Sequence, residues 1–194
     1  QARVGRDFFW VRDVTLSNST WGNRQLRLHD PRAGVHALGG GIGQGLAMGI
    51  GAAISAAVNA PQKKTWALCG DGGFVLNLGE LACAVQERAN LVVLLMNDQG
   101  YGVIKNIQDA QYGGRKVYAD LHTPDYAQLC AALGVAHLKV SSAAGFGAAL
   151  DAAVAHSGGP LIVEVDMLSV GPFKTAFAGP PVNPNNPLPA PGAR

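Results

Sequence analysis

The sequence predicts an α/β fold, a doubly wound and mostly parallel sheet with helices on both faces. The first observation is a set of short apolar runs at 65–69, 91–96 and 161–165. Such runs are typical of parallel strands that are covered on both sides. The second observation is that segments of helical composition separate these runs. Strands that alternate with helices indicate a parallel sheet rather than an antiparallel one.

The elements can be assigned in chain order. A strand is expected at 9–16 and a loop from Ser17 to Ala37. A helix at 43–58 is rich in Gly and Ala but lacks the Leu and Phe bulk of a lipid-facing span, so we expect a buried, closely packed helix. The remaining expected elements are a strand at 65–69, a turn at 70–73, a helix at 76–88, a strand at 91–96, a helix at 124–133, a strand at 135–140, a helix at 143–156 and a strand at 161–165.

Composition limits the function. The chain has 194 residues, of which 14% are charged, and a net charge of +2 with no basic block. Binding to nucleic acid or to a membrane surface is therefore not expected. Three Cys without metal-site spacing, and no secretory signal, predict a cytoplasmic protein with reduced thiols. We expect residues 1–178 to form one domain and the Pro-rich residues 179–194 to form an irregular tail.

Two Gly-rich loops follow consecutive predicted strands. The first is Gly70-Asp71-Gly72-Gly73, and the second is Asn97-Asp98-Gln99-Gly100-Tyr101-Gly102. If the strands are neighbours, the two Asp side chains meet at the carboxyl edge of the sheet, where ligands bind. Adjacent carboxylates repel each other unless a cation lies between them, and Mg²⁺ favours carboxylates together with phosphate oxygens. The glycines leave backbone N–H groups accessible to phosphates, so the pattern predicts a metal-bridged diphosphate. For either Asp alone, a turn residue would be the favoured interpretation, because Asp-Gly turns are common.

The spacing of these loops resembles a known motif. The triplet at 70–72, then 24 residues (73–96) and then Asn97-Asp98, is similar to the motif of thiamine diphosphate-dependent enzymes. The segments "LGGGIGQGLAMGIGAA" and "GDGGFVLNLGELACAVQERANLVVLLMNDQGYGVIKNIQ" resemble the cofactor-binding domain of acetolactate synthases and benzoylformate decarboxylases. The resemblance covers roughly residues 9–168. It implies thiamine diphosphate and Mg²⁺ as cofactors, a 2-oxo acid substrate, and at least a homodimer.

The resemblance also implies roles for individual residues. The metal ligands would be Asp71, Asp98 and the Gly100 carbonyl. Backbone N–H groups of Gly72, Gly73 and Tyr101 would bind the diphosphate, beside Gly70. Ile42 would wedge between the two rings of the cofactor and the Gly40 carbonyl would accept from its amino group, so these two are the catalytic candidates. Asn18 and Ser19 fall near the family's diphosphate-contacting residues in a loose alignment. The complete set is Asn18, Ser19, Gly40, Ile42, Gly70, Asp71, Gly72, Gly73, Asp98, Gly100 and Tyr101.

Some family features are missing from the sequence. Ile104 stands where pyruvate decarboxylases carry Glu, and Ile107 stands where acetohydroxyacid synthases carry Trp. The Glu that activates the cofactor belongs to a separate pyrimidine-binding domain, and none of Glu80, Glu87 and Glu164 lies in a matching context. We therefore expect half of an active site, completed by a pyrimidine-binding domain in cis or in trans. The missing Met at residue 1 is what a fragment or a processed chain would show.

Several alternatives remain. The chain could be a non-catalytic cofactor-binding module, and the sequence does not choose between decarboxylation and carboligation or decide on FAD. A nicotinamide site is disfavoured, because "GGGIGQGLAMG" lacks the third Gly of the fingerprint and a preceding strand. Ile42 could belong to the core, and His29, His36 and His122 are expected to be structural or solvated. Gln111 and Tyr112 could form a lid over the site or an ordinary loop.

Overall fold

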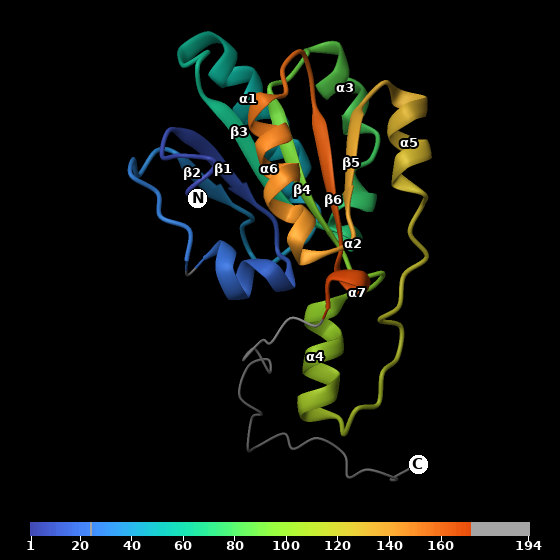
Figure 1. Cartoon of the computed structure of the whole chain (residues 1–194). Coiled ribbons are helices and arrows are strands. Elements are labelled where there is room, and N and C mark those ends of the chain that lie inside the picture. Colours follow the sequence, from blue (N-terminus) through green and yellow to red (C-terminus); the bar gives the residue numbers. More distant parts are fainter. Residues whose placement is uncertain (24, 172–194) are drawn as a thin grey trace.

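The computed structural model describes residues 1–23 and 25–171, without the side chains of Ser19 and Thr20. One six-stranded sheet with the order β2-β1-β3-β4-β6-β5 forms its centre, and every strand pair is parallel (Figure 1). The predicted α/β class is confirmed, with an all-parallel sheet over the described residues. The elements are β1 (Phe8–Arg12), η1 (Asn18–Gly22), β2 (Gly34–His36), α1 (Gln44–Asn59), β3 (Lys64–Gly70), α2 (Asp71–Leu76), α3 (Glu80–Gln86), β4 (Leu91–Asn97), α4 (Gly102–Gln111), α5 (Tyr126–Leu133), β5 (Ala136–Val140), η2 (Ala143–Gly145), α6 (Phe146–Ala155), β6 (Leu161–Asp166) and α7 (Met167–Val170).

The central strands are the ones whose sequences are most apolar. Every residue of β4 is buried, and so are five of the six residues of β6. Apolar side chains on both faces of a strand stabilise only a strand that is covered on both faces, and β4 contributes to the apolar clusters on both faces of the sheet. In contrast, all three residues of the edge strand β2 are exposed.

The two faces of the sheet carry separate apolar clusters. On one face, α1, α2, α3 and α5 supply side chains such as Leu46, Phe74 and Tyr126. On the other face, α6 supplies Phe146 and Leu150, and it lies across the front of the sheet in Figure 1. Helices on both faces are what a doubly wound sheet requires.

Helix α1 packs closely on the sheet through its glycines. A Cβ on Gly49 would lie 3.0 Å from the Cβ of Ala67, and a Cβ on Gly45 would lie 3.0 Å from the Sγ of Cys69. The expected close packing is therefore present, but on one side only, because Val58 is exposed. Among the described residues, none of the helices has both the length and the apolar character needed to cross a membrane.

Four local expectations are corrected. The strand expected at 9–16 ends at Arg12, and the loop expected at 17–37 contains η1 and β2. The expected turn at 70–73 already begins helix α2, and the helix expected at 76–88 is interrupted between α2 and α3. Helix α4, which follows the second Gly-rich loop, was not expected. The domain end at 178 and the tail at 179–194 lie outside the described residues.

The topology indicates where a ligand would bind. The chain leaves β1 toward β2 on one side and leaves β3 toward β4 on the other side, so the direction of the connections reverses between the neighbouring strands β1 and β3. In open parallel sheets, such a reversal opens a crevice at the carboxyl ends of the two strands. Helix α4 projects beyond the carboxyl ends of the strands (Figure 1).

Candidate cofactor site

A cavity of 360 Å³ lies at the carboxyl ends of β1, β3 and β4. Residues from five separate segments line it, and they include most of the predicted site. The predicted residues on its wall are Gly40, Ile42, Gly70, Asp71, Gly72, Gly73, Asp98, Gly100 and Tyr101. The two Gly-rich loops are brought together because β3 and β4 are hydrogen-bonded neighbours, with Gly70 opposite Met96.

Asp71 is the first residue of α2 and is only 2% exposed. Its Oδ1 accepts a hydrogen bond of 2.9 Å from the Gly72 N–H, and its Oδ2 accepts one of 3.1 Å from the Gly100 N–H. The second bond links the two Gly-rich loops directly. Burial raises the pKa of Asp71, while these N–H groups act in the opposite direction.

Asp98 interacts directly with Asp71 across the cavity. Burial raises the pKa of Asp98 to about 7, and repulsion from the charge of Asp71 adds to this effect. The ammonium group of Lys105 on α4 partly offsets the rise. Two carboxyl groups in this arrangement hold a shared proton or need a cation. Lys105 pairs instead with Asp120, at 2.9 Å.

The oxygen donors at this site fit Mg²⁺. The described residues hold no group of three or more His, Cys, Asp and Glu side chains that could bind a metal by themselves. Two carboxylates and the Gly100 carbonyl would leave open positions on the ion. Mg²⁺ commonly fills such positions with phosphate oxygens and water. The site is therefore suited to an ion that arrives with a phosphate ligand.

Glycines form a tight cradle beside the two acids. A Cβ on Gly72 would lie 2.7 Å from a ring carbon of Tyr101, and a Cβ on Gly73 would lie 3.0 Å from the backbone N of Gly43. The Gly73 N–H lies in the first turn of α2, where a helix provides no partner for it. The Tyr101 N–H, in contrast, donates to the Ala119 carbonyl at 2.8 Å. The third predicted phosphate donor, the Gly72 N–H, donates to the carboxylate of Asp71 at 2.9 Å. Of the three, Gly73 is therefore the one whose N–H is left without a backbone partner by its position in the helix.

The loop before α1 carries Gly40 and Ile42 into the same cavity. Gly40 and Gly43 have φ values of 73° and 96°, which side-chain-bearing residues rarely adopt. Asp13, at the end of β1, fixes this loop: its carboxylate accepts from the N–H groups of Gly43 (2.9 Å) and Gly45 (3.1 Å). A carboxylate at a helix N-terminus is favourable, so Asp13 connects β1 to the start of α1.

Asp13 was not among the predicted site residues. It directly follows an apolar strand, as Asp71 and Asp98 do, and that signal was available. Thr15, beyond the same strand, also lines the cavity.

The loosely aligned candidates lie elsewhere. Asn18 is in η1, accepts from Arg12 at 3.3 Å, and is not part of the cavity wall. Ser19 is in the same segment, and its side chain lies outside the described part. Among the described residues, those on the cavity wall include no His, and the structural or solvated role expected for His29, His36 and His122 stays a prediction. Gln111 ends α4 rather than lying in a loop.

The chain is similar to a known protein family over most of its length. The family described as "Thiamine pyrophosphate enzyme, C-terminal TPP binding domain" matches residues 16–165, and thiamine pyrophosphate is another name for thiamine diphosphate. The chain is 33% identical over 98 residues to 3D-(3,5/4)-trihydroxycyclohexane-1,2-dione hydrolase of Halalkalibacterium halodurans, covering 47% of this chain and 15% of that protein. It is 28% identical over 141 residues to acetolactate synthase of Mycobacterium bovis, covering 70% of this chain and 22% of that protein.

Solved structures share the fold. A 4-hydroxybenzoylformate decarboxylase from Rhodococcus jostii, described as thiamine diphosphate-dependent, has a TM-score of 0.73 and 25% identity, over 84% of this chain and 30% of that one. Benzoylformate decarboxylase from Polynucleobacter necessarius has a TM-score of 0.76 and 19% identity, over 87% of this chain and 32% of that one. The chain thus spans about a third or less of the length of these proteins.

Proposed function

Because the chain belongs to the thiamine pyrophosphate enzymes, as their C-terminal cofactor-binding domain, we propose that it binds thiamine diphosphate through Mg²⁺ in an enzyme that acts on 2-oxo acids. The reaction would be decarboxylation or an acetolactate synthase-like carboligation. The single observation that carries the proposal is the meeting of Asp71 and Asp98 in one cavity at the edge of the sheet. The names of the relatives support the reaction class.

The proposed roles follow from the positions of the residues. Asp71, Asp98 and the Gly100 carbonyl bind the ion, and the ion binds the diphosphate. The N–H of Gly73, which the first turn of α2 leaves without a backbone partner, would donate to the same diphosphate, and Gly72 would keep side-chain bulk away from it. A preorganised set of this kind holds its charges in place before the substrate arrives.

The loop before α1 has the second role. Ile42 would hold the two rings of the cofactor in a folded arrangement, and the Gly40 carbonyl would accept a hydrogen bond from the amino group. When bound, thiamine diphosphate supplies a nucleophile for the substrate carbonyl and an electron sink for the loss of CO₂. The hydrogen bonds from Gly43 and Gly45 to Asp13 keep this loop in a fixed position.

A pyrimidine-binding partner is part of the proposal. No Glu lines the cavity within the described residues, so the acid that activates the cofactor would come from another domain or subunit. Exposed apolar side chains border the same edge of the sheet, including Leu38 and Leu76, which are 72% and 60% exposed. A covering chain, from a homodimer or a longer polypeptide, would bury them. The free thiols Cys69, Cys83 and Cys130 suit the proposed cytoplasmic location.

A second candidate function is a cofactor-binding module without turnover. The absence of a Glu from the described cavity wall favours it for the isolated chain. A screen of 2-oxo acids with the intact protein would separate the two candidates, because only the enzyme would release CO₂ or form a new carbon–carbon bond.

The cofactor site itself is tested by titrating thiamine diphosphate with and without MgCl₂. We expect binding that depends on Mg²⁺ in the natural protein and no such dependence after Asp71→Ala. A matched control is Asp30→Ala, because Asp30 is a loop acid that pairs only with Arg32 among the described contacts. Equal Mg²⁺ dependence in all three proteins would refute the assignment of Asp71.

A further inference from the structure

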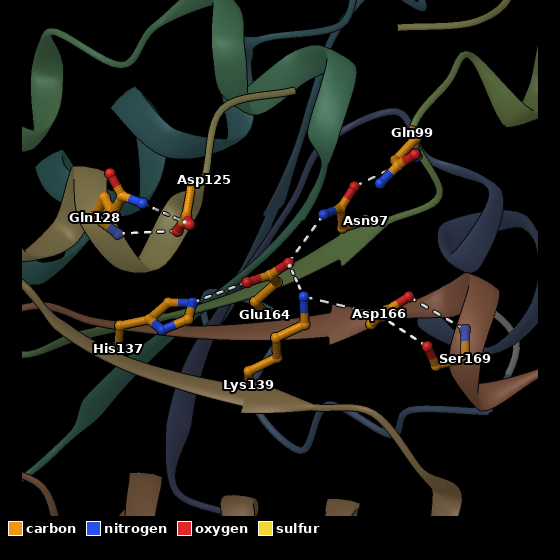
Figure 2. Close-up of polar contacts among 9 residues, drawn as sticks. All are labelled: Asn97, Gln99, Asp125, Gln128, His137, Lys139, Glu164, Asp166 and Ser169. Carbon is orange, nitrogen blue, oxygen red and sulfur yellow. Dashed lines mark hydrogen bonds and ion pairs between the residues drawn. The ribbon is translucent and has the colours of Figure 1, made fainter. Parts of the chain in front are cut away.

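Glu164 is a buried acid that the proposed site does not use. It lies in β6, is 4% exposed, and interacts with three side chains (Figure 2). Its Oε1 accepts from the Nδ2 of Asn97 at 2.9 Å and lies 3.4 Å from the Nζ of Lys139. Its Oε2 lies 3.0 Å from the Nε2 of His137. A buried carboxylate is costly unless it is paired and hydrogen-bonded, so these partners explain how Glu164 is tolerated.

The strand register explains why these residues meet. Strand β6 lies between β4 and β5, with Glu164 opposite Leu95 on one side and Lys139 on the other. Side chains two residues apart in a strand share a face, so Asn97 joins Leu95 and His137 joins Lys139. The network therefore extends from β5 through β6 to the last residue of β4. The cation-binding loop, which we define as Asn97–Gly100, begins at this residue.

Glu164 determines how the side chain of Asn97 is oriented. A carboxylate only accepts hydrogen bonds, so Asn97 must present its amide NH₂ to Glu164. Its Oδ1 then faces the loop and accepts from the Gln99 N–H at 3.3 Å. Gln99 has a φ of 51°, in the left-handed region that a residue with a side chain adopts at a cost. The hydrogen bond from Gln99 to Asn97 is made inside that strained turn.

The strained turn orients the groups that were assigned to the cation. The next residue, Gly100, donates its N–H to Asp71 at 3.1 Å, and its carbonyl is a proposed ligand. Asp98 lies between Asn97 and Gln99, so its direction depends on the same turn.

We propose that Glu164 is a positioning residue which, through Asn97, holds the cation-binding loop in its ligand-binding shape. This inference rests on the proposed function, because it gives the loop the task of binding Mg²⁺. Glu164 does not line the cavity and would touch neither the ion nor the substrate. Lys139 and His137 fix the carboxylate from β5, and Lys139 also lies 3.7 Å from Asp166.

The test compares Glu164→Ala, Glu164→Gln and Asn97→Ala in the intact protein. The Mg²⁺ concentration needed for thiamine diphosphate binding is measured by isothermal titration calorimetry. Outer partners of metal ligands typically change metal affinity about 10- to 100-fold, and we expect a loss of that size for both Ala variants. Glu164→Gln should recover part of it, because the amide oxygen can still accept from Asn97. Glu87→Gln, at an exposed acid, is the matched control and should behave as the natural protein does.

A second readout does not depend on the cofactor. Amide hydrogen exchange in the cofactor-free protein should become faster at Gln99 and Gly100 in both Ala variants. A purely structural role for Glu164 would lower the melting temperature without this local change. Asn97→Ala keeps the test valid if Glu164→Ala fails to fold.

The outcomes separate this inference from the proposed function. Unchanged Mg²⁺ affinity in folded Glu164→Ala and Asn97→Ala, together with loss of binding in Asp71→Ala, would overturn the positioning role alone. Unchanged affinity in Asp71→Ala as well would overturn the proposed site and this inference with it.

Discussion

Replacement of Asp13 by Ala should destabilise the domain strongly, although Asp13 was assigned no ligand. The side chain is 1% exposed and accepts from Gly43, Gly45 and the neighbouring Val14 N–H. Gly43 and Gly45 are themselves buried, so Asp13→Ala leaves two buried N–H groups without an acceptor. Each such group costs about 1–3 kcal/mol, which gives about 2–6 kcal/mol for the pair. The total free energy of unfolding of a domain is typically about 5–15 kcal/mol, so this loss would be a large fraction of it.

Urea unfolding of the intact protein, without cofactor, measures this effect as a change in midpoint at constant slope. Asp13→Asn should lose less, because one carbonyl oxygen can still accept from an N–H of α1. Asp30→Ala again serves as the surface control, with an expected change below about 0.5 kcal/mol. A loss below about 1 kcal/mol for Asp13→Ala would refute the reasoning, since it would mean that water replaces the carboxylate at no cost.

The other predictions concern the glycines and the acids of the site. Gly73→Ala should lower the free energy of unfolding in urea by about 1–3 kcal/mol and weaken thiamine diphosphate binding, because the new Cβ would lie 3.0 Å from the backbone N of Gly43. Gly51→Ala in the open part of α1 should instead stabilise the protein by about 0.5–1 kcal/mol; equal effects at both positions would contradict the cradle. Mg²⁺ affinity should rise with pH up to about 7 and then level off, because below its raised pKa Asp98 holds a proton that the ion must displace. The metal-free protein should also lose stability as pH rises from about 4 to 7, since the unfolded pKa of Asp is about 3.9 and the folded state favours the protonated form. Asp98→Asn should flatten both profiles, and profiles that keep their slope in this variant would exclude Asp98 as the titrating group.

The sequence predicted the buried elements well. Strands β3, β4 and β6 and helix α1 lie within one residue of the expected bounds at each end. An uninterrupted apolar or Gly/Ala-rich run must be buried, so its ends in the sequence mark the ends of the buried element. Strand β2 was missed for the opposite reason: its three side chains are all exposed, and its place is fixed by backbone pairing with β1. Helix α4 was missed because none of its residues is buried.

The part of the site that could be predicted from the sequence is the part formed by the ends of adjacent strands. Asp71 and Asp98 meet because consecutive strands are neighbours, which is the common arrangement in such sheets. The contact between Asn97 and Glu164 depends on β6 entering the sheet between β4 and β5, which periodicity does not reveal. The hydrogen bond from the Gly43 N–H to Asp13 depends on the conformation of the loop before α1, and the pattern of apolar and polar residues does not predict a loop conformation.

The most direct test of the proposed metal site is an anomalous diffraction map from crystals of the intact protein grown with thiamine diphosphate and Mn²⁺ in place of Mg²⁺. We predict one strong peak between the carboxylates of Asp71 and Asp98, within about 2.3 Å of an oxygen from each and of the Gly100 carbonyl. Bound cofactor with the peak at another place, or with no metal at these acids, would contradict it.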